Sequence, residues 1–121
     1  MPIDRPTAAE LLSAVREHLT ERLAPTLEGQ PAFHLRVATN ALAIVERTLA
    51  EGETMDRAEK KRLSLLLGAR GDLVGLNQKL SKAIHQGELD NQRDALLKHL
   101  RKTADDKLRL ANPRYNVPRD N

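Results

Sequence analysis

Residues 32–47 have the sequence "AFHLRVATNALAIVER", and this stretch decides the fold class. On a helical wheel of about 100° per residue, the apolar side chains of residues 33–49 fill an arc of roughly 200°. An arc of that width exceeds what a helix with one buried side requires. We therefore expect a central helix that neighbouring helices contact on most sides.

Four polar residues lie among these apolar positions, namely His34, Arg36, Asn40 and Arg47. His34 falls near the middle of the apolar arc, and the other three line one edge of it. Two guanidinium groups and an amide in a line suit a phosphate or a carboxylate, because arginine presents a planar fork of donors. However, polar side chains on an apolar face usually hydrogen-bond to a neighbouring helix, and edge arginines cover the core with their stems. The pattern favours this structural interpretation and leaves the binding site open.

The composition of the whole chain predicts an all-α protein. Leu and Ala, which have high helix propensity, dominate its 121 residues, and Phe33 and Tyr115 are the only aromatic residues. This length corresponds to one domain, which we place at residues 1–112. Residues 113–121 have no periodicity and are expected to form an irregular tail in which Tyr115 is anchored by packing.

Capping patterns and glycines set the helix boundaries. Thr7 and Glu10 form a capping box, three aspartates are predicted N-caps, and Gly52 and Gly87 are expected to end helices. The predicted N-caps are Asp56, Asp72 and Asp90. The predicted helices are residues 7–23, 31–51, 56–68, 72–87 and 90–111. Helices with such short connections fold most simply as an up-and-down bundle of about five helices.

The last predicted helix has an apolar face that contains one cation, Arg93. The apolar residues of this face are Leu89, Leu96, Leu97, Leu100, Ala104, Leu108 and Ala111. Arg93 is expected either to pair with an acidic residue of another helix or to approach the same space as Arg36 and Asn40. The opposite face carries Lys98, Lys102 and Arg109, and its aspartates four residues earlier predict a solvated surface with ion pairs.

The sequence lacks the residue patterns of several kinds of catalytic and metal-binding site. The chain has no cysteine, none of its four histidines has a Glu three residues before it, and none has a histidine partner four residues away. A Gly-rich phosphate loop is also absent. We therefore expect no catalytic residues, no metal site and no cofactor, and we favour a protein that is not an enzyme.

Charge and hydropathy limit the partners and the location. The net charge is only +3, with an excess of four positive charges in residues 91–121. Two aromatic residues make a poor stacking platform for single-stranded nucleic acid, so nucleic-acid binding is not favoured. The N-terminus lacks a signal-peptide pattern and no apolar run approaches the roughly 20 residues that cross a bilayer. We expect a cytoplasmic protein without a membrane segment.

Three blocks of the sequence resemble a family of small, all-helical bacterial proteins without an assigned function. These blocks are "RPTAAELLSAVREHL", "AFHLRVATNALAIVER" and "NPRY", and the likeness covers about residues 5–115. Members are typically encoded beside a phosphotransferase that resembles aminoglycoside or choline kinases, and often beside an acyl-CoA dehydrogenase. The resemblance implies an accessory role near such enzymes and supplies no catalytic residue.

Two functions remain as hypotheses. The first is a non-catalytic accessory or interaction protein that acts with a neighbouring phosphotransferase-like or acyl-CoA-metabolising enzyme, or that forms a homo-oligomer. The alternative is a small helical binder of an anionic ligand such as an acyl-CoA or a phosphorylated alcohol, or a weak enzyme acting on it. The alternative requires the Arg36, Asn40 and Arg47 stripe to bind the ligand, with His34 and Arg93 nearby.

Overall fold

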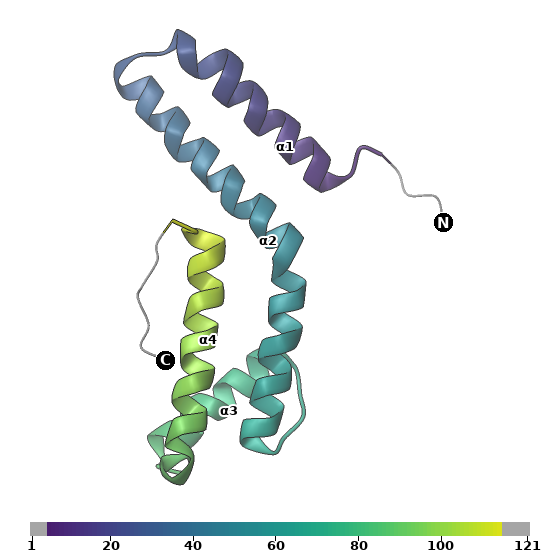
Figure 1. The fold of residues 1–121 in the computed structure, drawn as a ribbon, viewed down its shortest axis with the longest axis vertical. Helices are drawn as coiled ribbons and strands as arrows, with labels where there is room; N and C mark the ends of the chain where they lie inside the picture. The colour runs from purple at the N-terminus through teal and green to yellow at the C-terminus, as the bar shows by residue number, and fades with distance from the viewer. Residues whose placement is uncertain (1–4, 115–121) are drawn as a thin grey trace. The chain divides into compact units, whose positions relative to one another are not determined.

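The computed structural model describes residues 5–114, and this part of the chain is helical without strands. Figure 1 shows its four α-helices, which are α1 (Ala8–His18), α2 (Gly29–Leu67), α3 (Leu73–His85) and α4 (Arg93–Ala111). The all-α prediction is confirmed, whereas the predicted number of five helices is wrong. The up-and-down order of the helices stays a prediction. Tyr115 lies outside the described residues, as does most of the predicted tail.

The missing boundary lies inside α2, which runs without a break through Gly52 and Asp56. The predicted helix end at Gly52 and the predicted N-cap at Asp56 are therefore wrong. A glycine inside a helix costs about 1 kcal/mol relative to alanine but leaves every backbone hydrogen bond intact. The flanking Glu51, Glu53 and Met55 favour the helix and offset this cost.

The contacts within the chain group into two compact units, Met1–Gly52 and Glu53–Asn121. The prediction of one domain over residues 1–112 stays a prediction. The helices of each unit form their own contacts.

The first unit is a helical hairpin whose start is fixed by the predicted capping box. Thr7 Oγ1 accepts from the Glu10 backbone N–H, and Glu10 Oε1 accepts from the Thr7 N–H. A π-helical turn (Leu19–Leu23) and a 3₁₀ turn (Ala24–Thr26) lead from α1 to α2. The two helices are joined by a bidentate ion pair in which Arg16 of α1 donates to Glu46 of α2, with 3.2 Å between Arg16 Nη2 and Glu46 Oε2.

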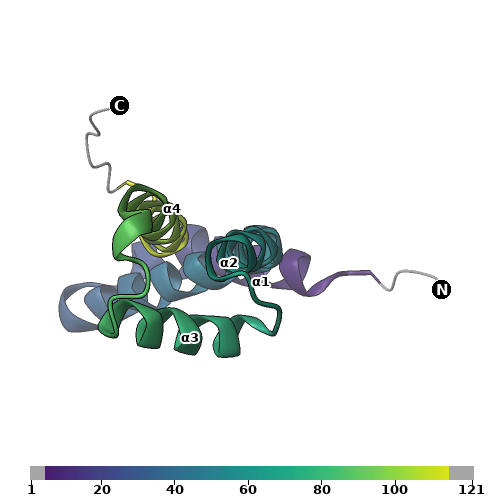
Figure 2. The same cartoon turned by 90° about the horizontal axis from the view of Figure 1, so that it is seen from below.

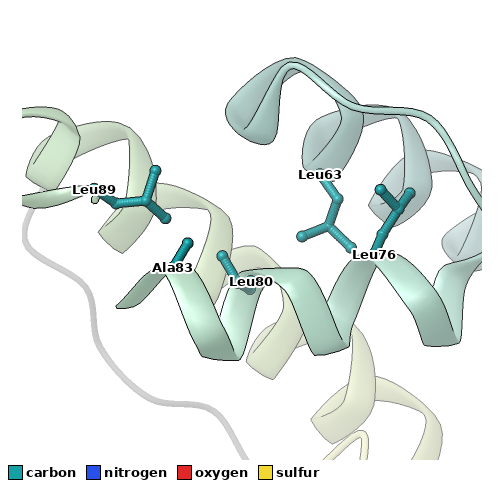
Figure 3. Close-up of a cluster of buried hydrophobic side chains, with 5 residues drawn as sticks. All are labelled: Leu63, Leu76, Leu80, Ala83 and Leu89. Atoms are coloured by element: carbon teal, nitrogen blue, oxygen red, sulfur yellow. The ribbon is translucent and has the colours of Figure 1, made fainter. Parts of the chain in front are cut away.

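The second unit holds the buried apolar cluster of the described residues. Figure 3 shows its five side chains, which are Leu63, Leu76, Leu80, Ala83 and Leu89. They come from the last part of α2, from α3 and from the turn before α4. Within this unit α4 runs beside the end of α2, and α3 crosses both (Figure 2). Leu63 and Leu76 are fully buried, so they are the centre of the core.

The start of α3 is held by Asp72, as the sequence predicts. Asp72 Oδ1 accepts from the Gly75 backbone N–H at 2.7 Å. Gly75 has no side chain because a Cβ there would lie 2.8 Å from that same oxygen. Glycine at this position therefore leaves room for the cap. At the other end, the chain leaves α3 through Gly87, whose φ of +72° suits glycine.

Replacing Asp72 with alanine is expected to lower the free energy of unfolding of the second unit by about 1 kcal/mol. The reason is that a first-turn N–H of α3 loses its acceptor. Urea unfolding followed by far-ultraviolet circular dichroism measures the change. Asp90→Ala is the matched control and is expected to stay within about 0.5 kcal/mol of the wild type. Equal losses in both variants would contradict the assigned cap.

The start of α4 differs from the prediction because Asp90 does not cap it. Asp90 begins a 3₁₀ turn (Asp90–Gln92), and α4 follows from Arg93 without a side-chain cap. Leu89 is 5% exposed, so its burial in the core fixes the path of the chain at this point. The predicted end of the helix is confirmed, since α4 ends at Ala111 before Asn112 and Pro113.

The side of α4 that faces the core also differs from the prediction. Leu97 and Leu100 are 39% and 40% exposed, whereas His99 is 4% exposed. The row that faces the core runs through the buried His99 and the half-buried Leu96 and Thr103, which share one side at spacings of three and four residues. Two polar residues of α4, His99 and Thr103, face the core because Arg62 of α2 donates hydrogen bonds to both.

No helix among residues 5–114 combines the length and the apolar character needed to cross a bilayer.

Candidate functional site

The first unit exposes a continuous apolar surface on α2. We call this surface the α2 apolar face, and its residues are Phe33, Val37, Ile44, Val45 and Leu49. Phe33 and Val37 are each 53% exposed, and Leu49 is 52% exposed. Residues 5–51 contain no buried side chain at all, so the hairpin does not enclose a core of its own. Large exposed apolar patches with polar edges mark interaction surfaces.

Phe33, Val37 and Ile44 of the α2 apolar face lie on the side of the helix that points away from α1, whereas Val45 and Leu49 lie nearer the α1 side. Leu35, Leu42 and Glu46 are half-buried on the side where Arg16 of α1 pairs with Glu46. At about 100° per residue, Phe33, Val37 and Ile44 are more than 120° from the middle of that side. Within the first unit, α2 is therefore contacted by α1 on one side only. The expectation of neighbours on most sides is not met in residues 5–52.

The five residues predicted as binding or buried polar residues are not buried in the structure. His34, Arg36, Asn40 and Arg93 are exposed, and Arg47 is half-buried. His34 lies within the α2 apolar face, and Arg36 and Asn40 lie on adjacent turns at its edge. These positions leave the binding interpretation as a prediction.

Two of these polar residues contact Phe33 of the α2 apolar face. The Arg36 guanidinium carbon lies 5.9 Å from the centre of the Phe33 ring, within the range of a cation–π interaction. The His34 ring meets the Phe33 ring edge-on, with 5.9 Å between the ring centres. An aromatic ring with a stacked arginine is typical of the residues that contribute most to protein interfaces.

Arg93 belongs to the second unit, where it is the first residue of α4. It is exposed and lines a shallow groove with Leu89, Asp90, Leu96 and Leu97. Arg93 therefore lies beside Asp90 and three leucines, at the start of α4. The prediction that it approaches Arg36 and Asn40 stays a prediction.

The one buried polar side chain among the described residues is His99, and sequence reasoning did not identify it. Arg62 of α2 donates from Nε to His99 Nδ1 and from Nη2 to Thr103 Oγ1, both at 3.1 Å. In residues 5–114 no buried side-chain nitrogen or oxygen lacks a hydrogen-bond partner. This network joins α2 to α4 and explains how α4 buries a polar row.

Burial lowers the pKa of His99, and the nearby Arg62 cation lowers it further, while Glu59 acts in the opposite direction. The imidazole is therefore neutral near pH 7. Its Nδ1 is the acceptor for Arg62, which places the ring proton on Nε2. A neutral, accepting histidine fits beside a cation, whereas a protonated one would lose this hydrogen bond.

The lowered pKa of His99 predicts how stability depends on pH. Below about pH 6.5 the unfolded histidine binds a proton that the folded one does not, so the free energy of unfolding falls as the pH falls. We expect wild type to lose up to about 1.4 kcal/mol per pH unit relative to His99→Gln, measured by urea unfolding. His85→Gln, at an exposed histidine of α3, should keep the wild-type dependence. Parallel pH profiles for wild type and His99→Gln would show that His99 titrates normally.

Beside this network, α2 and α4 line an open groove of about 490 Å³. Its apolar lining comes from Leu65 and Leu66 of α2 and Ala95 of α4. His99 lies at its base, and its cations are Arg62, Lys98 and Lys102. No carboxylate lines it, so the groove combines an apolar floor with positive charge.

A family model described as a domain of unknown function (DUF6285) matches residues 25–115. This is three quarters of the sequence. The chain belongs to the DUF6285 family. The matched range contains two of the three blocks that carried the resemblance, residues 32–47 and 112–115, while the block at residues 5–19 lies before it. No curated protein and no solved structure matches the chain.

The DUF6285 match includes both surfaces described above, the α2 apolar face and the groove between α2 and α4. The described part of this DUF6285 protein has no group of three or more histidine, aspartate or glutamate side chains placed to hold a metal ion. Its two candidate surfaces are instead apolar, with cations or amides beside them.

Proposed function

We propose that this protein is a non-catalytic accessory protein that acts in the cytoplasm by binding a partner protein through the α2 apolar face. The observation that supports this proposal is the exposure of Phe33 and Val37, each 53% exposed, on the side of α2 that points away from α1. Leaving so much apolar surface in water is unfavourable, and covering it is worth about 25 cal/mol per Å². A partner that covers the face supplies this free energy.

The composition of the face fits a protein interface. Its centre is apolar and includes an aromatic ring, and its edge carries Arg36 and Asn40, which matches the apolar core and polar rim of known interfaces. The partner we propose is a phosphotransferase-like enzyme or an acyl-CoA dehydrogenase. This choice rests on the family resemblance.

A second proposal is a small helical binder of an anionic ligand, such as an acyl-CoA or a phosphorylated alcohol. One observation favours it, namely that Arg36 and Asn40 are exposed on adjacent turns of α2 and can both donate to one anionic group. Arg36→Ala should then abolish ligand binding measured by calorimetry. The cation–π contact of Arg36 with Phe33 fits the protein interface equally well, so the first proposal has the broader support.

Co-expression of the chain with the phosphotransferase-like protein, followed by size-exclusion chromatography with light scattering, tests the first proposal. The expected result is a joint peak whose mass equals the sum of the two chains. A separate peak at twice the mass of this chain would replace the enzyme with a second copy as the partner. Separate peaks with this chain as a monomer would contradict the proposal for this enzyme, and the same measurement with the acyl-CoA dehydrogenase then decides the proposal as a whole.

A further inference from the structure

The groove between α2 and α4 is a second candidate site that the proposed function does not use. It lies in the second unit, whereas the α2 apolar face belongs to the first. Its volume of about 490 Å³ falls within the roughly 300–1,000 Å³ of small-molecule sites in proteins. The groove therefore has the size of a ligand site.

Part of the groove is lined by an apolar strip. Leu65, which lines the groove, is 77% exposed. Leu66 and Ala95 continue the apolar strip across the groove to α4. The hydrogen bonds of Arg62 to His99 and Thr103 hold α2 and α4 in this arrangement. An apolar strip held open by a satisfied polar network can receive an apolar group without rearrangement of the fold.

The three cations that line the groove differ in whether a carboxylate already pairs with them. Lys102 Nζ pairs with Asp106 Oδ1 at 3.1 Å, and Arg62 donates to two neutral side chains. Lys98 forms no ion pair with any residue in the range 5–114. An ammonium group at the edge of an apolar strip attracts an anion, and Arg62 adds a second positive charge, although Glu59 lies one turn earlier on the same helix.

We propose that this groove binds a single alkyl chain that ends in a carboxylate. The alkyl chain covers Leu65, Leu66 and Ala95, and the carboxylate pairs with Lys98. A protein partner fits less well, because a stable protein interface takes about 20–30 residues from each side and only eight residues line this groove. The inference is independent of the partner proposed for the α2 apolar face.

Titration calorimetry with dodecanoate, below its micelle concentration and near neutral pH, tests the proposal on the full-length chain. We expect saturable binding of one dodecanoate per chain. Lys98→Glu should weaken it about tenfold or more, because one charge-assisted contact is lost and repulsion is added. Ala95→Phe should abolish it by filling the groove, at little cost to folding because Ala95 is exposed.

Controls separate this site from general detergent binding. Lys107→Glu reverses an exposed charge elsewhere on α4 and should leave the affinity unchanged. Equal binding of dodecyltrimethylammonium, an unchanged affinity of Ala95→Phe, or the absence of saturation would each overturn the proposal. Nuclear magnetic resonance shifts on dodecanoate addition should occur at Ala95 and His99, and shifts confined to residues 5–52 would also overturn it. The proposal would also be overturned if dodecanoate failed to bind and a protein partner shielded Leu65 and Ala95 from solvent.

Discussion

Replacing Leu76 with alanine is expected to lower the free energy of unfolding of the second unit by about 2–5 kcal/mol. Leu76 is completely buried and packs with Leu63 and Leu80 at the centre of the only buried cluster in the described residues. The substitution removes buried methyl groups and leaves a cavity that the three surrounding helices fill only in part. Because small domains are marginally stable, a loss of this size threatens the folded state itself.

Urea unfolding followed by far-ultraviolet circular dichroism measures this loss, and Leu65→Ala is the matched control. The same atoms are removed there from a side chain that is 77% exposed, so the change should stay within about 0.5 kcal/mol. Similar losses at both positions would mean that Leu65 is covered in solution. A loss below about 1 kcal/mol at Leu76 would contradict the core described for the second unit.

Replacing Val37 with aspartate is expected to weaken the complex with the partner about 30-fold or more. Val37 is 53% exposed near the middle of the α2 apolar face, next to Phe33 and Ile44 along the helix. An unpaired carboxylate in a desolvated interface centre costs at least about 2 kcal/mol of binding free energy. The fold should survive, because the side chain is exposed and valine and aspartate have similar helix propensities.

The affinity of the complex, measured by calorimetry, is the readout, and Val74→Asp is the matched control. Val74 is 69% exposed in the first turn of α3, where an aspartate is favourable for the helix. The Val74→Asp variant should bind the partner with the wild-type affinity. If Val37→Asp binds normally while Val74→Asp does not, the interaction surface belongs to the second unit.

The helix ends that depend on local chemistry were predictable from the sequence. The capping box of Thr7 and Glu10 and the cap at Asp72 each need only residues within one turn, and both are confirmed. Gly52 shows where this reasoning fails, because a glycine lowers helix stability without forcing an end. Asp90 failed for a different reason, since burial of Leu89 determines the path of the chain before α4.

The candidate surfaces were predictable only in part. The wide apolar arc in residues 32–47 correctly indicated that α2 has apolar side chains beyond those facing one neighbour. Which of them stay exposed depends on packing that the pattern does not contain. The buried histidine was missed because the Leu97 and Leu100 row is more apolar than the row of His99 and Thr103. Only Arg62, 37 residues earlier in the chain, makes burial of His99 favourable.

Methyl cross-saturation from a protonated partner onto the methyl-labelled chain tests most directly whether the α2 apolar face is the interaction surface. The account predicts that the methyl signals of Val37, Ile44, Val45 and Leu49 lose intensity in the complex. The signal of the buried Leu76 should keep its intensity. Saturation confined to the exposed Leu97 and Leu100 of α4, with the α2 signals unchanged, would contradict it.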